Sequence, residues 1–181
     1  MVFSTLLSPV HFLMLRAFSV ADRARDPTDP RYTTSYCFLL GYSLISWRSK
    51  KQTHVAYSST KAKYRALADT TFELLWLRWL LKDLDVSASS ATSLYCDNQS
   101  VIYIAHNDVF HERTKHIEID CYFIHYHLIH GALKLILVFS TDQLADIFEF
   151  WSLLITFYWF WIDLTKGNSQ NQAWKVSCLR Y

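Results

Sequence analysis

Glycine and proline are scarce in this chain, with three of each among 181 residues. Hydrophobic residues make up 51% of the sequence and aromatic residues 17%. This composition excludes a disordered or low-complexity chain, and the length suffices for one domain with a substantial core. Neither sign of charge dominates, because the formal net charge is only +2. Charge alone therefore does not indicate nucleic-acid binding, and a polyanion would have to bind at a local basic patch.

The cysteines are few and scattered, and no Cys-x-x-Cys pair indicates a metal site. A disulfide framework is not expected in a chain of this size. We therefore expect reduced thiols and an intracellular protein, in the cytoplasm or the nucleus. The four cysteines are Cys37, Cys96, Cys121 and Cys178.

No apolar run reaches the roughly 20 residues that a helix needs to span a bilayer. The apolar N-terminus resembles a signal peptide, but no Lys or Arg precedes it and Arg16 interrupts it. A strand that feeds the core is expected there, and secretion is not. The stretch 150–162, "FWSLLITFYWFWI", is also too short to span a membrane. It is either an interfacial or buried helix, or sequence never selected for folding.

Hydrophobic periodicity and turn residues predict the elements along the chain. A polar loop is expected over 22–35, and Gly41 and Tyr42 should form a hairpin turn. Antiparallel strands followed by strand–helix–strand units imply a mixed sheet covered by helices. The predicted strands are 13–20, 36–41, 43–47, 93–97 and 133–139, and the predicted helices are 60–84, 98–107, 114–131 (with Gly131 as the C-cap glycine) and 142–148 (capped by Thr141).

The start of the long helix contains a contradiction. Ser58, Ser59 and Thr60 are good N-cap residues, and a glutamate three residues after Thr60 would complete a capping box. The sequence instead has Lys61 and Lys63 in this first turn, where the helix dipole favours carboxylates. The cap chemistry and the charge of this turn therefore disagree.

Five segments in this order, "ISWRSKKQ", "SSTKAKYRALA", "LYCDNQSVI", "FHERTKHIEID" and "DQLADIF", carry a family resemblance. From about residue 12 to 148 the chain resembles the ribonuclease H domain of copia-type LTR retrotransposon Pol polyproteins. The resemblance implies a ribonuclease H-like α/β fold, with a mixed five-stranded sheet flanked by helices. It also implies a domain over 1–148, with 149–181 as an aromatic-rich extension outside the family, for which a frameshift is our interpretation.

The resemblance implies an activity as well, hydrolysis of the RNA strand of an RNA–DNA hybrid with two Mg²⁺ or Mn²⁺ ions. Such ions need several converging carboxylates. Of the four family acids, the third falls on Asp97 and the fourth on Asp146. The first falls on Val20 and the helix glutamate on Lys63, so two metal ligands are replaced. Asp22 lies on the same side of the strand as Val20 but about 6.5 Å further along.

Two basic segments could contact a nucleic-acid backbone without reading its sequence. The alternative for each is an ordinary solvated surface. Asn98 and Gln99 could also bond to a backbone, although Asn98 is equally suited to cap the next helix. The candidate cations are Arg48, Lys50 and Lys51 in the first segment, and Arg113, Lys115 and His116 in the second.

Three functional hypotheses remain open. The one we favour is a catalytically inactive ribonuclease H-like domain that keeps weak binding to an RNA–DNA hybrid or other nucleic acid. The others are an active metal-dependent hybrid ribonuclease that uses Asp22, and a relic reading frame with no selected role. No reverse transcriptase, protease or integrase motif is present, and no protein partner or membrane is predicted.

Overall fold

The computed structural model describes residues 14–23, 30–86, 90–107, 118–148, 150, 151 and 154. One long helix follows the first three strands, and two shorter helices separate the last two strands. The elements are β1 Leu15–Arg23, β2 Tyr32–Leu40, β3 Ser43–Lys51, α1 Ser59–Asp83, β4 Thr92–Cys96, α2 Gln99–His106, α3 Glu118–Ile129, β5 Leu133–Leu137 and the 3₁₀ turn η2 Ser140–Asp142.

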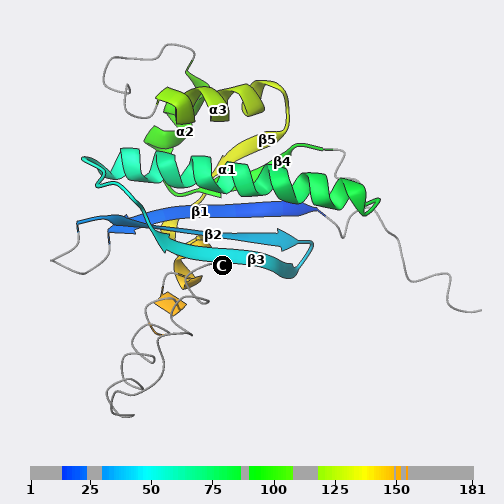
Figure 1. Cartoon of the computed structure of the whole chain (residues 1–181), viewed down its shortest axis with the longest axis horizontal. Helices are drawn as coiled ribbons and strands as arrows, with labels where there is room; N and C mark the ends of the chain where they lie inside the picture. Colours follow the sequence, from blue (N-terminus) through cyan, green and yellow to red (C-terminus); the bar gives the residue numbers. More distant parts are fainter. Residues whose placement is uncertain are drawn as a thin grey trace, which may run out of the picture.

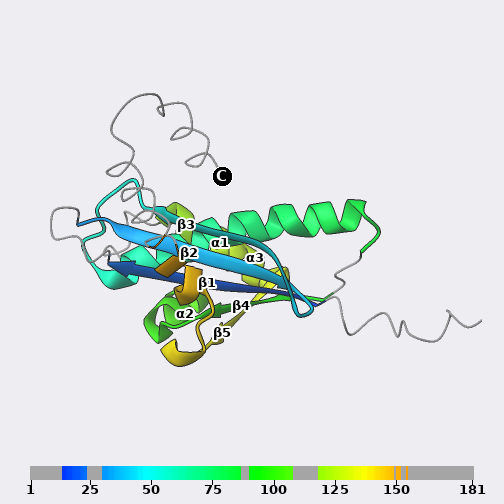
Figure 2. The ribbon, with the colours of Figure 1, turned by 90° about the horizontal axis from the view of Figure 1, so that it is seen from below.

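The sheet is mixed, as the sequence predicts, with the strand order β3-β2-β1-β4-β5. The first three strands pair antiparallel, whereas β1 with β4 and β4 with β5 pair parallel. Helices α1, α2 and α3 cover one face (Figure 1). The segment that follows η2 lies against the other face, as the view from below shows (Figure 2). The central strands are therefore covered on both faces.

Helix α1 is held to the sheet by an apolar stripe at helical spacing. Tyr64, Leu67 and Leu74 are fully buried, and the stripe continues through Leu77 and Leu81. It packs against Leu15, Ala17 and Phe38 from β1 and β2 in the main core. Ser58 is the N-cap, and its side chain accepts the backbone N–H of Lys61. No acidic residue lies in the first turn, so the contradiction seen in the sequence persists in the fold.

Strand β2 begins earlier than the sequence predicts. The loop predicted over 22–35 is wrong at both ends, because β1 continues through Asp22 and β2 starts at Tyr32. Paired strands on both sides hold this polar stretch, so tertiary pairing overrides local propensity. Its buried polar groups find partners, since Ser35 Oγ donates to Ser49 Oγ at 2.9 Å and Thr34 accepts from Gln52 at 3.0 Å.

The C-terminal helix also differs from its prediction. Thr141 lies inside η2, whose N-cap residue Phe139 makes no side-chain cap bond, and helical residues begin at Ala145. The predicted cap at Thr141 is therefore wrong. The prediction for Gly131 is confirmed, because it follows α3 with a φ of +67°, a conformation that favours glycine. Residues 114–117 of the predicted third helix lie outside the described residues.

Three of the four cysteines, Cys37, Cys96 and Cys121, are described, and all three are free and buried. Among the residues that the structure describes, no helix combines the length and the apolar character that crossing a membrane requires. Only three residues of the stretch 150–162 fall within the described part of the chain.

Gln143 fastens the C-terminal segment to β1. Its side chain is 4% exposed, and its Nε2 donates to the backbone carbonyl of Ser19 at 3.0 Å. Gln143→Ala should lower the free energy of unfolding by about 1–3 kcal/mol, because it leaves a buried carbonyl without this donor. Urea denaturation of the full chain measures the change. Asp142→Ala, at an exposed neighbouring position, is the control and should shift the free energy by less than about 0.5 kcal/mol. Equal losses in the two variants would contradict the role of Gln143.

Candidate functional site at the carboxyl ends of β1 and β4

The charged residues meet where β4 ends and its parallel pairing with β1 stops. Ser19 of β1 pairs with Cys96 of β4, so the next residues along the two strands are Val20 and Asp97. The start of α1 lies over this edge, because Ala62 packs against Ala21. The C-terminal segment reaches it from the other face, where Ala145 packs in one cluster with Val20. Three separate parts of the chain thus converge on Asp97.

An ion pair forms the centre of this site. The Lys63 ammonium lies 2.5 Å from Oδ2 of Asp97 and donates a hydrogen bond to it. The side chains are 19% and 9% exposed, respectively. The second carboxylate oxygen of Asp97 is buried, and no hydrogen-bond partner for it is found among the described residues. Asp97 is therefore a nearly buried acid whose main stabilising charge is Lys63.

Two further acids share this centre. Burial raises the pKa of Asp146, the carboxylates of Asp97 and Asp22 raise it further, and Lys63 lowers it. Asp146 and Asp22 are exposed, so water solvates them in part. Val20, in contrast, is buried at 5% exposure and offers only a hydrocarbon. Asp97, Asp22 and Lys63 thus all act on the charge of Asp146, whereas Val20 contributes no charge to the site.

These residues do not fit a two-metal centre. Within the described ranges, no group of three or more His, Cys, Asp or Glu side chains is arranged to hold a metal ion. Val20 has no ligand atom, and a protonated Lys63 has no lone pair. Its ammonium already bonds to Asp97, where a cation would have to bind. The Mg²⁺ or Mn²⁺ that the resemblance implies therefore lacks a ligand set here.

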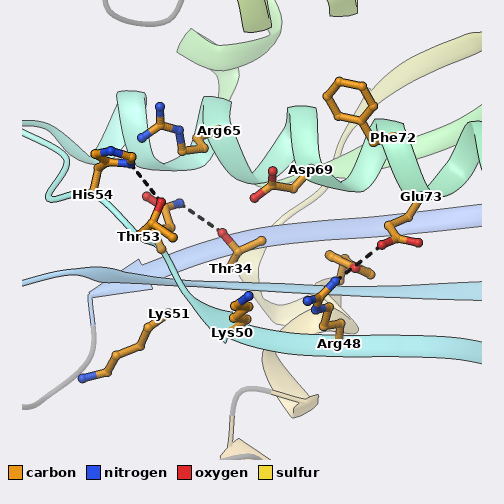
Figure 3. A pocket seen from close by; sticks show the side chains of 12 residues that line it. Thr34, Arg48, Lys50, Lys51, Thr53, His54, Arg65, Asp69, Phe72 and Glu73 are labelled. Atoms are coloured by element: carbon orange, nitrogen blue, oxygen red, sulfur yellow. Dashed lines mark hydrogen bonds and ion pairs between the residues drawn. The ribbon is translucent and has the colours of Figure 1, made fainter. Parts of the chain in front are cut away.

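The predicted basic residues of β3 line a cleft of about 380 Å³ between this strand and α1 (Figure 3). Arg48 is engaged within the protein, since its guanidinium lies 3.5 Å from Glu73 and also bonds to Tyr36. Burial raises the pKa of Tyr36 to about 12, although its hydrogen bond with Arg48 acts in the opposite direction. Lys50 is exposed and Lys51 is half-buried.

The remaining predicted contacts separate into two groups. Asn98 is the N-cap of α2, and its Oδ1 accepts the backbone N–H of Val101 at 3.0 Å. The capping alternative that the sequence leaves open is therefore realised. Gln99 is exposed in the first turn of the same helix. The second basic segment, with Arg113, Lys115 and His116, lies outside the described residues.

Sequence patterns did not reveal the buried polar side chains that connect the segments around the site. Gln52 is 5% exposed and donates to Thr34 at 3.0 Å and to the carbonyl of Ala62 at 2.8 Å, one residue before Lys63. The hydroxyl of Thr70 donates a hydrogen bond to the hydroxyl of Ser19 at 2.8 Å, and Ser19 directly precedes Val20. Together with Gln143, these groups join α1, β1 and the C-terminal segment. A single buried polar residue has no periodicity, so no sequence signal distinguishes it.

The N-cap at Asn98, which directly follows Asp97, can be tested by substitution. Asn98→Ala should lower the free energy of unfolding by about 0.5–2 kcal/mol, because a backbone N–H at the start of α2 loses its acceptor. Gln99→Ala, at the adjacent exposed position, should change it by less than about 0.5 kcal/mol. Thermal and urea denaturation measure both variants. If Asn98→Ala leaves stability unchanged, the bond to Val101 contributes nothing and the cap assignment fails.

Two solved structures share the fold of this chain. One is the N-terminal ribonuclease H domain of Rv2228c from Mycobacterium tuberculosis, with a TM-score of 0.50 and 8% identity over 80% of this chain and 99% of that one. The other is LC11-RNase H1, solved in complex with an RNA/DNA hybrid, with a TM-score of 0.50 and 10% identity over 73% of this chain and 91% of that one. At these identities the likeness establishes the fold alone, and the chain has a ribonuclease H-like fold.

The sequence relatives give the particular family. The chain is 46% identical over 134 residues to the retrovirus-related Pol polyprotein from transposon RE2 of Arabidopsis thaliana, and 34% identical over 133 residues to that from transposon TNT 1-94 of Nicotiana tabacum. Each match covers 74% of this chain but only 9% and 10% of the relatives. No family model matches. The chain belongs with the copia-type retrotransposon Pol polyproteins, of which it spans about a tenth of the length.

Proposed function

We propose that this chain is a ribonuclease H-like domain that has lost hydrolysis of RNA–DNA hybrids and keeps a weak affinity for nucleic acid. One observation carries the proposal, the bond from the Lys63 ammonium to the Asp97 carboxylate at 2.5 Å. The resemblance implies a metal ligand at each of these two positions. Here the two side chains bind each other instead, so the carboxylate is engaged within the chain.

The chemistry of two-metal hydrolysis explains why this bond opposes catalysis. Two cations about 3.5–4 Å apart activate the attacking water and stabilise the leaving oxygen. Mg²⁺ binds oxygen ligands in near-octahedral geometry, so several carboxylates must face it. Val20 contributes no oxygen, and Lys63 contributes a positive charge that repels a cation near Asp97. Half of the family's four ligand positions therefore work against metal binding.

The nucleic-acid part of the proposal rests on the cleft between β3 and α1. Lys50, Lys51 and Arg65 line it and can neutralise phosphates without reading sequence. Two acids on α1, Asp69 and Glu73, face the same cleft and offset part of this charge (Figure 3). For that reason we propose weak binding. The complex of LC11-RNase H1 makes an RNA–DNA hybrid the first ligand to test.

A second candidate, an active nuclease, has one observation in its favour. The charge of Asp22 acts on Asp146, so Asp22 lies within electrostatic reach of the centre. It is exposed, however, and lies two residues beyond Val20 on β1. Taking the place of the missing acid would require the end of this strand to rearrange. We further propose an intracellular location and treat residues 149–181 as an extension outside the domain. A relic frame with no selected role predicts neither cleavage nor binding.

Cleavage of a labelled RNA–DNA hybrid by the full chain tests the loss of activity. With Mg²⁺ or Mn²⁺ we expect no cleavage above background, because the ligand set is incomplete. The double variant Val20→Asp, Lys63→Glu restores two carboxylates and should cleave measurably. Adding Asp97→Asn to that variant should abolish the gain. Cleavage by the native chain that disappears with Asp97→Asn would instead establish an active nuclease and direct attention to Asp22.

Binding of the same hybrid, measured by fluorescence anisotropy over a range of salt concentrations, tests the cleft. Lys50→Ala should weaken binding and reduce the slope of log K against log salt by about one, because one phosphate contact is lost. Lys134→Ala removes an equal charge from an exposed position on β5, at the opposite edge of the sheet, and should change little. Equal effects of the two variants would show non-specific attraction in place of binding at the cleft.

A further inference from the structure

We propose that Lys63 is the resident cation of this site, a tethered counter-ion that replaces the structural role of a bound metal and frees the fold from any need for divalent cations. The inference rests on the proposed function, because both rely on Lys63 standing where a metal ligand is implied. It goes further in giving the lysine a positive role. Any side chain without ligand oxygens at position 63 would be enough to explain a loss of catalysis.

The burial of Asp97 is the first argument. Its side chain is 9% exposed, and one of its oxygens is buried with no partner among the described residues. A buried carboxylate is costly unless an opposite charge lies against it. Lys63 supplies this charge at 2.5 Å. A neutral side chain at position 63 would leave Asp97 buried without a counter-charge.

The convergence of acids is the second argument. The carboxylates of Asp97 and Asp22 both act unfavourably on the charge of Asp146, whereas the ammonium of Lys63 acts favourably on it. Like charges at short range oppose the approach of the strands and segments that carry them. In a metal centre, divalent cations remove this repulsion. In this chain, a covalently attached ammonium stands beside the most buried of the three acids.

The position of α1 over the sheet lets the side chain of Lys63 reach Asp97. Gln52 holds the carbonyl of Ala62, and Ala62 packs against β1, so the backbone beside Lys63 is fixed over the site. The four-carbon stem of lysine spans the gap to Asp97, and its head brings three donors as a compact point charge. Direct contact by a long cation thus takes the place of a bridge through metal.

The test compares Lys63→Met with Lys61→Met in the full chain. Both variants remove one ammonium from the start of the same helix and add a side chain of similar length. The bond from the Lys61 backbone N–H to the Ser58 side chain is independent of either side chain. Thermal denaturation is followed with chelator or with millimolar Mn²⁺. Binding of Mn²⁺ alone is followed by the loss of the free-ion signal in electron paramagnetic resonance.

In chelator, Lys63→Met should melt about 5–10 °C below the native chain, because breaking a buried ion pair strands the remaining charge. Mn²⁺ should restore much of this loss and should bind saturably, since the oxygens of Asp97 and Asp146 are no longer opposed by an ammonium. The native chain and Lys61→Met should show no such binding or rescue. Adding Asp97→Asn to Lys63→Met should remove the response to Mn²⁺.

Three results would overturn the inference. One is an equal melting temperature for Lys63→Met and Lys61→Met. Another is a Lys63→Met protein whose folding or melting does not respond to Mn²⁺. The third is saturable Mn²⁺ binding by the native chain that disappears with Asp97→Asn. The cleavage assay tests the proposed function separately. If the native chain fails to cleave the hybrid and either of the first two results is found, the role of Lys63 as a counter-ion is rejected but the loss of catalysis still stands.

Discussion

The parallel pairing of β1 with β4 decides where charge can gather in this chain. Its register ends at Ser19 and Cys96, so Val20 and Asp97 are the next residues along the two central strands. Helix α1 covers one face at this edge and the C-terminal segment covers the other (Figures 1 and 2). Carboxyl ends of parallel strands are where α/β sheets leave polar groups available. Every element that reaches this edge must therefore accommodate the charge of Asp97, and Lys63 does so directly.

Much of the fold could be predicted because its patterns are local. The apolar stripe of α1, the hairpin at Gly41 and Tyr42, and the glycine after α3 are each visible within a short window of sequence. The start of β2 cannot be recognised in such a short window. The polar residues of Tyr32–Ser35 form a strand because β1 and β3 pair with them on both sides. The distance between those partners along the chain is why local propensity gave a loop instead.

The candidate site, like the fold, could be predicted only in part from the sequence. The resemblance predicts that Asp97 and Asp146 are two of the family's acids and that Val20 and Lys63 stand where the other two are expected. It could not show what Lys63 does, because its partner lies 34 residues away and is reached only when α1 packs on the sheet. Gln143 is separated from Ser19 by 124 residues, and no pattern announces a buried glutamine that bonds to a strand carbonyl. Side chains that join distant segments are visible only in the folded chain.

On the assignment that the resemblance implies, charge balance explains why Val20 and Lys63 belong together. Four carboxylates with two divalent cations are neutral, whereas Val20 and Lys63 leave two of these acids with one ammonium. The remaining negative charge falls on Asp146 and on the neighbouring Asp22, which are both exposed and can be solvated by water. An aspartate at position 20 beside Lys63 would add a buried carboxylate with no second cation. A glutamate at position 63 beside Val20 would leave Asp97 unpaired unless metal bound with one ligand fewer. On this assignment each replacement lowers the electrostatic cost of the other, and the chain compensates the charge of Asp97, the most buried acid, with the ammonium of Lys63.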